Sequence, residues 1–178
     1  MEKEMEENNK NSKKSKFFLI FHDYISYILI ILAVLFLKYH VVTPIHVRGD
    51  SMMDTLHNGD IMILNIIGYK FQPIKRFDVV VVREGKEWII KRVIGLPGEV
   101  VEYRDNQLYV NDKKVEDKYA SKETGNFKVK IAKGYYFVLG DNRTNSADSR
   151  VFGSFPRKDI LGKTNFTIFP FNRFGKKE

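Results

Sequence analysis

The chain has 178 residues, of which 43% are hydrophobic and 29% are charged, and these proportions exclude wholesale disorder. It contains no cysteine, which excludes a disulfide framework, a thiolate nucleophile and a cysteine-based metal site. The four histidines leave little material for a metal site, and no cofactor is expected. The formal net charge of +8 is compatible with nucleic acid, with an anionic membrane surface or with no specific partner.

Residues 1–16 are polar, charged and without periodicity, so they predict a disordered tail. Residues 17–37 are apolar except for a short interruption at His22 and Asp23, and Lys38 and Tyr39 end the expected segment 17–39. A membrane-spanning helix needs about 20 apolar residues, so this segment predicts a single transmembrane signal anchor. A buried core helix would need a larger domain around it. A cleaved signal peptide would need small residues after the apolar run, where the sequence has Lys-Tyr-His-Val-Val.

The lysines in front of the apolar segment predict its orientation. Positive charge favours the cytoplasmic side, so the N-terminus is expected in the cytoplasm and residues 40–178 outside it. Basic residues elsewhere are spread along the chain rather than gathered with aromatic residues into a stripe, so no nucleic-acid partner is expected. The lysines that carry the orientation argument are Lys10, Lys13, Lys14 and Lys16.

Beyond residue 40 the sequence changes to short β-rich runs. The strongest strand signal is the run of four valines within Phe77–Arg83. Asp105 and Asn106 predict a tight hairpin turn, and Pro44 marks an edge position or a bend. The pattern is therefore mainly β, with a small excursion over about 105–133 that is richer in Lys, Asp and Glu. The other expected strands are 40–47, 60–67, 87–95, 100–104, 107–111, 135–139 and 163–169.

Ser51 follows a Gly-Asp turn, directly after an expected strand. A serine at such a corner exposes its hydroxyl and brings backbone N–H groups near it, which a nucleophile with an oxyanion hole requires. The alternative is an ordinary helix N-cap.

Lys91 and Arg92 lie within an otherwise apolar strand. Neighbours on a strand point to opposite faces, and both faces are otherwise apolar, so one of the two cations is expected to be partly buried. A lysine among aliphatic side chains has a lowered pKa, and as a neutral amine it can accept the proton of a serine hydroxyl. The alternative is a lysine whose amine reaches the surface.

The segment 140–153 is unusually polar for a β scaffold. Asp141, Arg143, Asp148 and Arg150 alternate in sign along it. Such a loop must be held by its own hydrogen bonds and ion pairs. The alternative is a polar surface turn.

Together and in this order, these segments closely resemble bacterial type I signal peptidases, the membrane-bound Ser–Lys endopeptidases. The resemblance covers nearly all of residues 20–170 and implies an antiparallel β-sheet catalytic domain behind one transmembrane helix. The matching boxes are SMMDTL at 51–56, GDI at 59–61, KRVIG at 91–95 with PGE at 97–99, and GDNRTNSADSRVFG at 140–153.

The resemblance implies a role for each matching residue. Ser51 matches the nucleophile, with its backbone N–H as one oxyanion donor, and Lys91 matches the general base. Ser146 matches a serine that orients the lysine amine. Three further residues match a supporting ion pair and a structural acid: Asp148 with Arg150, and Asp141. The family's S1 and S3 pockets accept small residues, which implies a preference for Ala-X-Ala before the cut. The positions that match the lining of these pockets are Val47, Met52, Leu56 and Ile90.

Two positions depart from the family pattern. Asp54 stands where the family has proline three residues after the serine, and a carboxylate near the site would raise the lysine pKa. Gly49 stands where some members have a serine that supplies a second oxyanion donor, so that donor must come from elsewhere.

The expected function is the removal of signal peptides from exported preproteins at a lipid bilayer, near the protein export channel. The main alternative is an inactive, membrane-anchored peptide-binding homologue, with Asp54 as the sign of decay. A Ser–His site using His46 or His57 has no partnering motif. A self-cleaving Ser–Lys repressor is disfavoured by the anchor and by the lack of a DNA-binding half.

Overall fold

The computed structural model describes residues 24–35, 42–53, 55–120 and 123–177. The chain divides into two compact units, Met1–His40 and Val41–Glu178. In the first unit residues 24–35 form a helix, and its large apolar side chains are exposed. Within the described ranges, no helix combines the length and the apolar character needed to cross a bilayer. The predicted tail and both ends of the predicted transmembrane segment lie outside the described residues.

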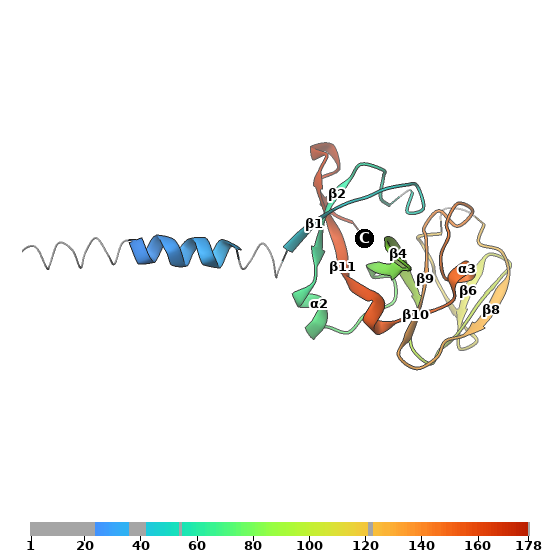
Figure 1. The fold of residues 1–178 in the computed structure, drawn as a ribbon. Helices are drawn as coiled ribbons and strands as arrows, with labels where there is room; N and C mark the ends of the chain where they lie inside the picture. The colour runs from blue at the N-terminus through green and yellow to red at the C-terminus, as the bar shows by residue number, and fades with distance from the viewer. Residues whose placement is uncertain (1–23, 36–41, 54, 121–122, 178) are drawn as a thin grey trace, which may run out of the picture. The chain divides into compact units, whose positions relative to one another are not determined.

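The second unit is built on a large antiparallel sheet (Figure 1). Its strand order is β1-β2-β11-β3-β4-β9-β10, and β12 pairs with β11. The strands are β1 (Val42–His46), β2 (Ile61–Asn65), β3 (Val79–Glu84), β4 (Glu87–Gly95), β9 (Tyr135–Leu139), β10 (Phe155–Pro156), β11 (Ile160–Phe169) and β12 (Gly175–Lys176).

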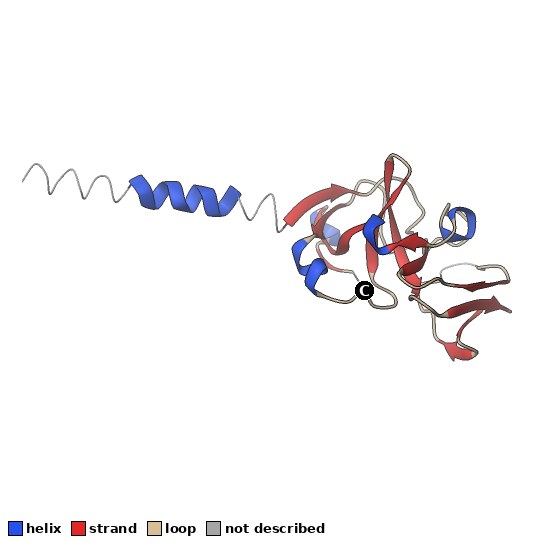
Figure 2. Ribbon diagram, turned by 60° about the horizontal axis from the view of Figure 1, so that its bottom comes forward, coloured by secondary structure: helices blue, strands red, loops and turns tan. Residues whose placement is uncertain are grey.

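A smaller antiparallel sheet has the order β7-β6-β5-β8 and is seen beside the larger one in Figure 2. Asp105 and Asn106 both have positive φ, 49° and 61°, which is the left-handed backbone of a two-residue hairpin. The predicted tight turn is therefore confirmed. The strands β7 and β8 were not predicted, because their lysines hide the apolar alternation. The bounds are β5 (Val100–Arg104), β6 (Gln107–Val110), β7 (Lys113–Val115) and β8 (Phe127–Lys130).

Only short helices interrupt the strands: α2 (Ile67–Phe71), α3 (Ser149–Phe152), and the 3-10 turns η1 (Arg157–Asp159) and η2 (Phe171–Arg173). The expected strand over 60–67 is too long, because it ends at Asn65 and α2 follows. The Asn65 side chain accepts a hydrogen bond from Gly68 N at 2.7 Å. This local bond offers the backbone an alternative to the sheet and starts the turn.

The run of four valines lies in β3, which is central in the sheet between β11 and β4. All four are buried, since this strand is covered on both faces. Pro44 lies on β1, the end strand of the order, where a missing N–H costs no ladder bond. The expectation of a mainly β, antiparallel fold is thus confirmed. The buried strand β3 also fixes the position of β4, with which it pairs along its whole length.

Candidate active site

Ser51 lies in the turn that leaves β1. The turn is tied to the start of β2, because Val47 N donates to Asp60 O at 2.8 Å and Gly59 N donates to Val47 O at 3.0 Å. Ser51 O accepts a hydrogen bond from Asn142 N at 3.1 Å, which joins the turn to the polar segment 140–153. The N–H of Ser51 donates to no described residue, so it is free to bind a ligand.

Lys91 occupies the middle of β4, paired with Val80 of β3. Its side chain is only 3% exposed, and its Nζ lies 2.7 Å from Ser51 Oγ in a hydrogen bond. Arg92 on the opposite face is 1% exposed, so both cations are buried where the sequence predicted one. The fold thus brings a serine and a desolvated amine together across 40 residues of chain.

Burial lowers the pKa of Lys91 to about 8, from an ordinary value of 10.5. The carboxylates of Asp148 and Asp141 act in the opposite direction and favour the charged amine. The effect of burial on the pKa is the larger one, because the charged amine loses its hydration while each carboxylate is paired with an arginine. A substantial fraction of this lysine is therefore neutral near physiological pH and able to accept a proton.

Ser146 lies beside the same group of residues. Its hydroxyl oxygen is buried and makes no hydrogen bond with Lys91, while its interaction with the Asp148 carboxylate helps to lower the pKa of that acid. Gly140 explains how Ser146 approaches Ser51, because a Cβ at Gly140 would overlap both Ser146 Oγ and Ser51 O. The glycine is required by this close approach.

We expect Gly140→Ala to lower kcat/KM by about 100-fold or more, since the methyl group must displace Ser51 and a misplacement of about 1 Å can cost that much. Gly162→Ala is the matched control: its Cβ would overlap Asn65 O in the pairing of β2 with β11, which lowers stability away from the site. Rates for folded protein, with thermal unfolding curves, check this. Equal loss of activity in both variants would refute it.

Asp141 anchors the face of β4 opposite Lys91. It accepts hydrogen bonds from Arg92 Nε at 2.8 Å, from Arg92 Nη2 at 2.7 Å and from Thr55 Oγ1 at 2.6 Å. Both side chains of the ion pair are 1% exposed. The Tyr119 ring covers the guanidinium, with its centroid 3.5 Å from Arg92 Cζ. This bidentate pair joins β4 to the polar segment directly behind the serine and the lysine.

Asp148 holds the other end of that segment. It accepts bonds from Gly140 N at 3.1 Å and from Arg150 Nε and Nη2, both at 2.9 Å. Burial alone would raise the pKa of Asp148, but these hydrogen bonds outweigh it and the pKa is lowered. The carboxylate therefore stays charged and also caps α3 through Arg150 N.

Arg143 ties the segment to the smaller sheet, and the sequence reasoning gave it no specific partner. Its Nε donates to Gly140 O at 2.9 Å, and its Nη2 pairs with Asp117 at 2.6 Å. Tyr103 OH donates to the same carboxylate and accepts from Arg143 Nη1. The partner could not be found from sequence, because Asp117 is one of many acidic residues in the 105–133 region.

A cleft of about 490 Å³ opens beside Ser51 and Lys91. Of the predicted pocket residues, Val47, Met52 and Ile90 line it. Leu56 is completely buried and packs with Val47 and Met52 in the apolar cluster below the cleft, rather than at its surface. Glu87 and Trp88 also line the cleft and were not singled out from the sequence, which gave no signal beyond their place on the strand of Lys91.

His46 lines the cleft, but within the described residues no histidine is hydrogen-bonded to Ser51 Oγ. That part of the chain also holds no group of three His, Asp or Glu side chains arranged for a metal. Asp54 lies outside the described residues, so its effect on the Lys91 pKa stays a prediction.

A serine hydroxyl bonded to a buried amine beside a cleft is the arrangement of a hydrolase with a serine nucleophile. A family model described as "Signal peptidase, peptidase S26" matches residues 20–169. A signal peptidase I of Bacillus caldolyticus is 40% identical over 158 residues, which cover 79% of this chain and 87% of that protein. A signal peptidase IB of Staphylococcus aureus is 41% identical over 155 residues, with coverage of 75% and 81%.

The crystal structure of a signal peptidase I from Enterococcus faecalis is 34% identical, covers 52% of this chain and 97% of that chain, and has a TM-score of 0.49. The sequence matches decide the assignment: the chain belongs to the signal peptidase family, peptidase S26. It is a serine peptidase, as the sequence predicted.

Proposed function

We propose that this protein cleaves signal peptides from exported preproteins with Ser51 as nucleophile and Lys91 as general base. The observation that carries the proposal is the 2.7 Å hydrogen bond between Lys91 Nζ and Ser51 Oγ, with the lysine 3% exposed. The neutral amine accepts the hydroxyl proton as Ser51 Oγ attacks the scissile carbonyl carbon. The amine then returns the proton to the leaving amino group, and an ester joins the signal peptide to Ser51.

The second half of the reaction uses the same two groups. Water takes the place of the departed chain, Lys91 Nζ accepts its proton, and the hydroxide oxygen attacks the ester carbonyl. Ser51 leaves with the proton held by the lysine, which restores the starting state. The free N–H of Ser51 is suited to donate to the oxyanion in both steps. This function needs no metal or cofactor.

Two free strand edges support extended binding of the preprotein. Among the described residues, β1 pairs only with β2, and β4 pairs with β9 only from Arg92 to Gly95, so residues 87–91 have one open edge. The cleft lies between residues 46–49 and 87–91. A peptide added as a strand here would place its scissile bond at Ser51. Val47, Met52 and Ile90 would face its side chains, with Leu56 supporting them from below.

The supporting residues act through the catalytic pair. Asp141, with Arg92, fixes β4, and Asp148, with Arg150, fixes Gly140 and the segment around Ser146. The buried hydroxyl of Ser146 lies beside the same group of residues and is suited to orient the lysine amine, as the family resemblance implies. These are positioning roles, since none of these side chains is hydrogen-bonded to Ser51 Oγ or Lys91 Nζ in the structure.

We also propose that residues 17–39 anchor the enzyme in the cell membrane, with the N-terminus cytoplasmic and the catalytic unit outside, near the export channel. The apolar composition of this segment and the exposed apolar side chains of the helix at 24–35 support the anchor. Confinement of enzyme and signal peptide to one surface raises their effective concentration.

The test is cleavage of a model preprotein with one Ala-X-Ala site by the full chain in detergent, with mass spectrometry of both products. We expect one cut, directly after the second alanine, because the pocket accepts small side chains. A matched preprotein with Leu in place of that alanine is the control and should stay intact. Failure of the folded enzyme to cut would favour the inactive peptide-binding homologue, and cleavage of both substrates would refute the specificity.

The pH dependence follows from the pKa of Lys91. Because the neutral amine is the active form and the pKa is about 8, about 9% of the enzyme is competent at pH 7 and about 91% at pH 9. We therefore expect kcat/KM to rise about tenfold over this interval.

The effect of the Lys91 pKa on stability does not oppose this rise of kcat/KM with pH. The folded pKa lies below the unfolded value of 10.5, so the unfolded chain binds more protons between about 8 and 10.5, and this group's contribution to stability increases with pH there. Rates at constant ionic strength check the profile. A rate that falls between pH 7 and 9 in folded enzyme would exclude Lys91 as the base.

A further inference from the structure

A second cavity, of about 460 Å³, lies away from the cleft. Arg92 lines this cavity whereas Lys91 lines the cleft, and neighbours on a strand point to opposite faces. The cavity is therefore on the other face of β4. Its walls come from β2, α2, β3, β11 and the C-terminal strand β12, so a ligand there would not compete with a preprotein.

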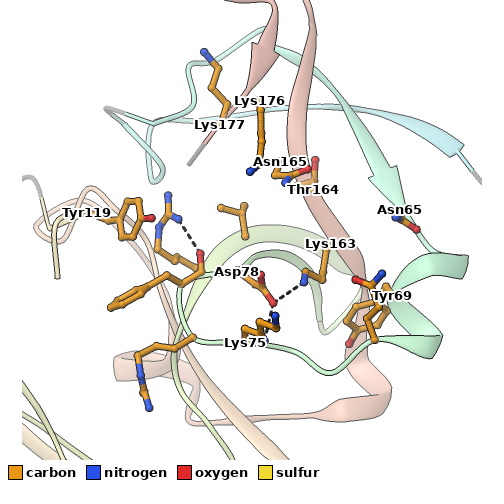
Figure 3. A pocket seen from close by; sticks show the side chains of 15 residues that line it. Asn65, Tyr69, Lys75, Asp78, Tyr119, Lys163, Thr164, Asn165, Lys176 and Lys177 are labelled. Atoms are coloured by element: carbon orange, nitrogen blue, oxygen red, sulfur yellow. Dashed lines mark hydrogen bonds and ion pairs between the residues drawn. The ribbon is translucent and has the colours of Figure 1, made fainter. Parts of the chain in front are cut away.

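The charge of the second cavity is strongly unbalanced. Six of its lining side chains are cationic against a single carboxylate, Asp78. Three of the cations have partners: Lys163 pairs with Asp78 at 2.8 Å, Arg76 with Glu99 and Arg92 with Asp141. In Figure 3 Lys176 lies above, and Lys75 below, the Lys163–Asp78 pair. No carboxylate among the described residues pairs with the other three lining cations, Lys75, Lys176 and Lys177.

Polar groups accompany these ammonium groups. Asn65, Gln72 and Asn165 line the second cavity with side-chain amides that can donate hydrogen bonds. The second cavity thus offers both charge and donors to an anion.

The arrangement favours a phosphate group over a carboxylate. Carboxylates are best held by the planar fork of an arginine, and Arg76 and Arg92 already use theirs on Glu99 and Asp141. The remaining cations are lysines, which bind phosphate as point charges. The volume exceeds that of one phosphate ion, so an organic part fits beside it.

We propose that the second cavity binds a phosphate group, carried either on a soluble ester or on a lipid headgroup, through Lys75, Lys176 and Lys177. The pairing of β12 with β11 presents the two C-terminal lysines, since Lys176 is opposite Phe166 and Lys177 N donates to Asn165 O at 2.6 Å. The proposal is independent of the catalytic assignment.

The test is calorimetric titration of the full chain in neutral detergent with glycerol 3-phosphate, against acetate at matched ionic strength. We expect saturable binding of the phosphate ester, at least tenfold tighter than that of acetate. The variant with Lys75, Lys176 and Lys177 all changed to Gln should bind the ester about tenfold or more weakly, since three attractions are lost. Thermal unfolding without ligand confirms that the variant is folded.

The matched control changes three exposed lysines of the smaller-sheet region, Lys113, Lys114 and Lys130, to Gln, and should bind like wild type. Ser51→Ala should also bind like wild type, which separates this proposal from the catalytic one. Competition by short-chain phosphatidylglycerol, but not phosphatidylcholine, would identify a lipid source, and its absence a soluble one. No binding above acetate, or equal loss in both triple variants, would overturn the proposal.

Discussion

Replacement of Ser51 or Lys91 by alanine is expected to lower kcat/KM for a preprotein on the order of 10⁴-fold or more, with the fold intact. Without Ser51 there is no acyl acceptor, and without Lys91 the hydroxyl proton has no acceptor at 2.7 Å. Because the two groups act as one unit, the double variant should be little worse than either single one. Product formation under single-turnover conditions measures this.

Lys86→Ala is the matched control for the lysine, because Lys86 is exposed in the turn between β3 and β4, only five positions away. It should keep wild-type activity. Substantial activity in Lys91→Ala would identify another base, and His46 is the first candidate because it lines the same cleft. Loss of activity in Lys86→Ala would mean that charge near the cleft, rather than the buried amine, is what matters.

Asp141→Ala is expected to lower the free energy of unfolding by about 3 to 5 kcal/mol. The substitution leaves the Arg92 guanidinium 1% exposed and without its bidentate partner, and an unpaired buried charge is among the most destabilising changes known. Against a usual total of about 5 to 15 kcal/mol, this loss is large. Urea unfolding followed by circular dichroism, at constant detergent concentration, measures it.

A surface ion pair provides the comparison. Asp159 pairs with Arg83 at 2.8 Å, but the arginine is 54% exposed, so Asp159→Ala should cost no more than about 1 kcal/mol. Similar losses for the two variants would contradict the view that burial sets the energy of the Asp141 pair. Arg92→Met with Asp141→Leu should recover part of the loss, because an apolar pair of similar volume leaves no buried charge.

The structure also gives the physical reason for the lowered pKa of Lys91, the proposed base. Its side chain is 3% exposed, and this burial removes water from the amine. Asp141 and Asp148 lie near enough to oppose this effect, but each is bonded to an arginine. The arginines therefore protect the neutral lysine by drawing the two carboxylates into separate pairs.

Much of the architecture was predictable because local patterns and tertiary structure agree. The four valines of β3 and the mixed run of β4 have few alternatives to strands, and Asp105-Asn106 has few alternatives to a tight turn. The end of β2 was misjudged, because the side chain of Asn65 ends the strand and residues 66 and 67 are still apolar. Strands rich in lysine, such as β7, were missed because their lysines hide the apolar alternation.

The candidate site divides in the same way. The order of the boxes around Ser51, Lys91 and the segment 140–153 is a property of the sequence, and it sufficed to identify the family. The sequence could not show that Gly140 makes room for Ser51, or that Arg143 pairs with Asp117, because both depend on contacts between distant segments.

The sequence by itself determined the family, the mainly β fold and the candidate nucleophile and base, because these are recorded in residue types and their order. Only the tertiary structure decided that Leu56 lies below the cleft, that Trp88 lines it, and that unpaired lysines of distant strands surround a second cavity. Burial, the pKa of Lys91 and the pairing of charges arise from how the sheets pack, and packing is a property of the whole fold.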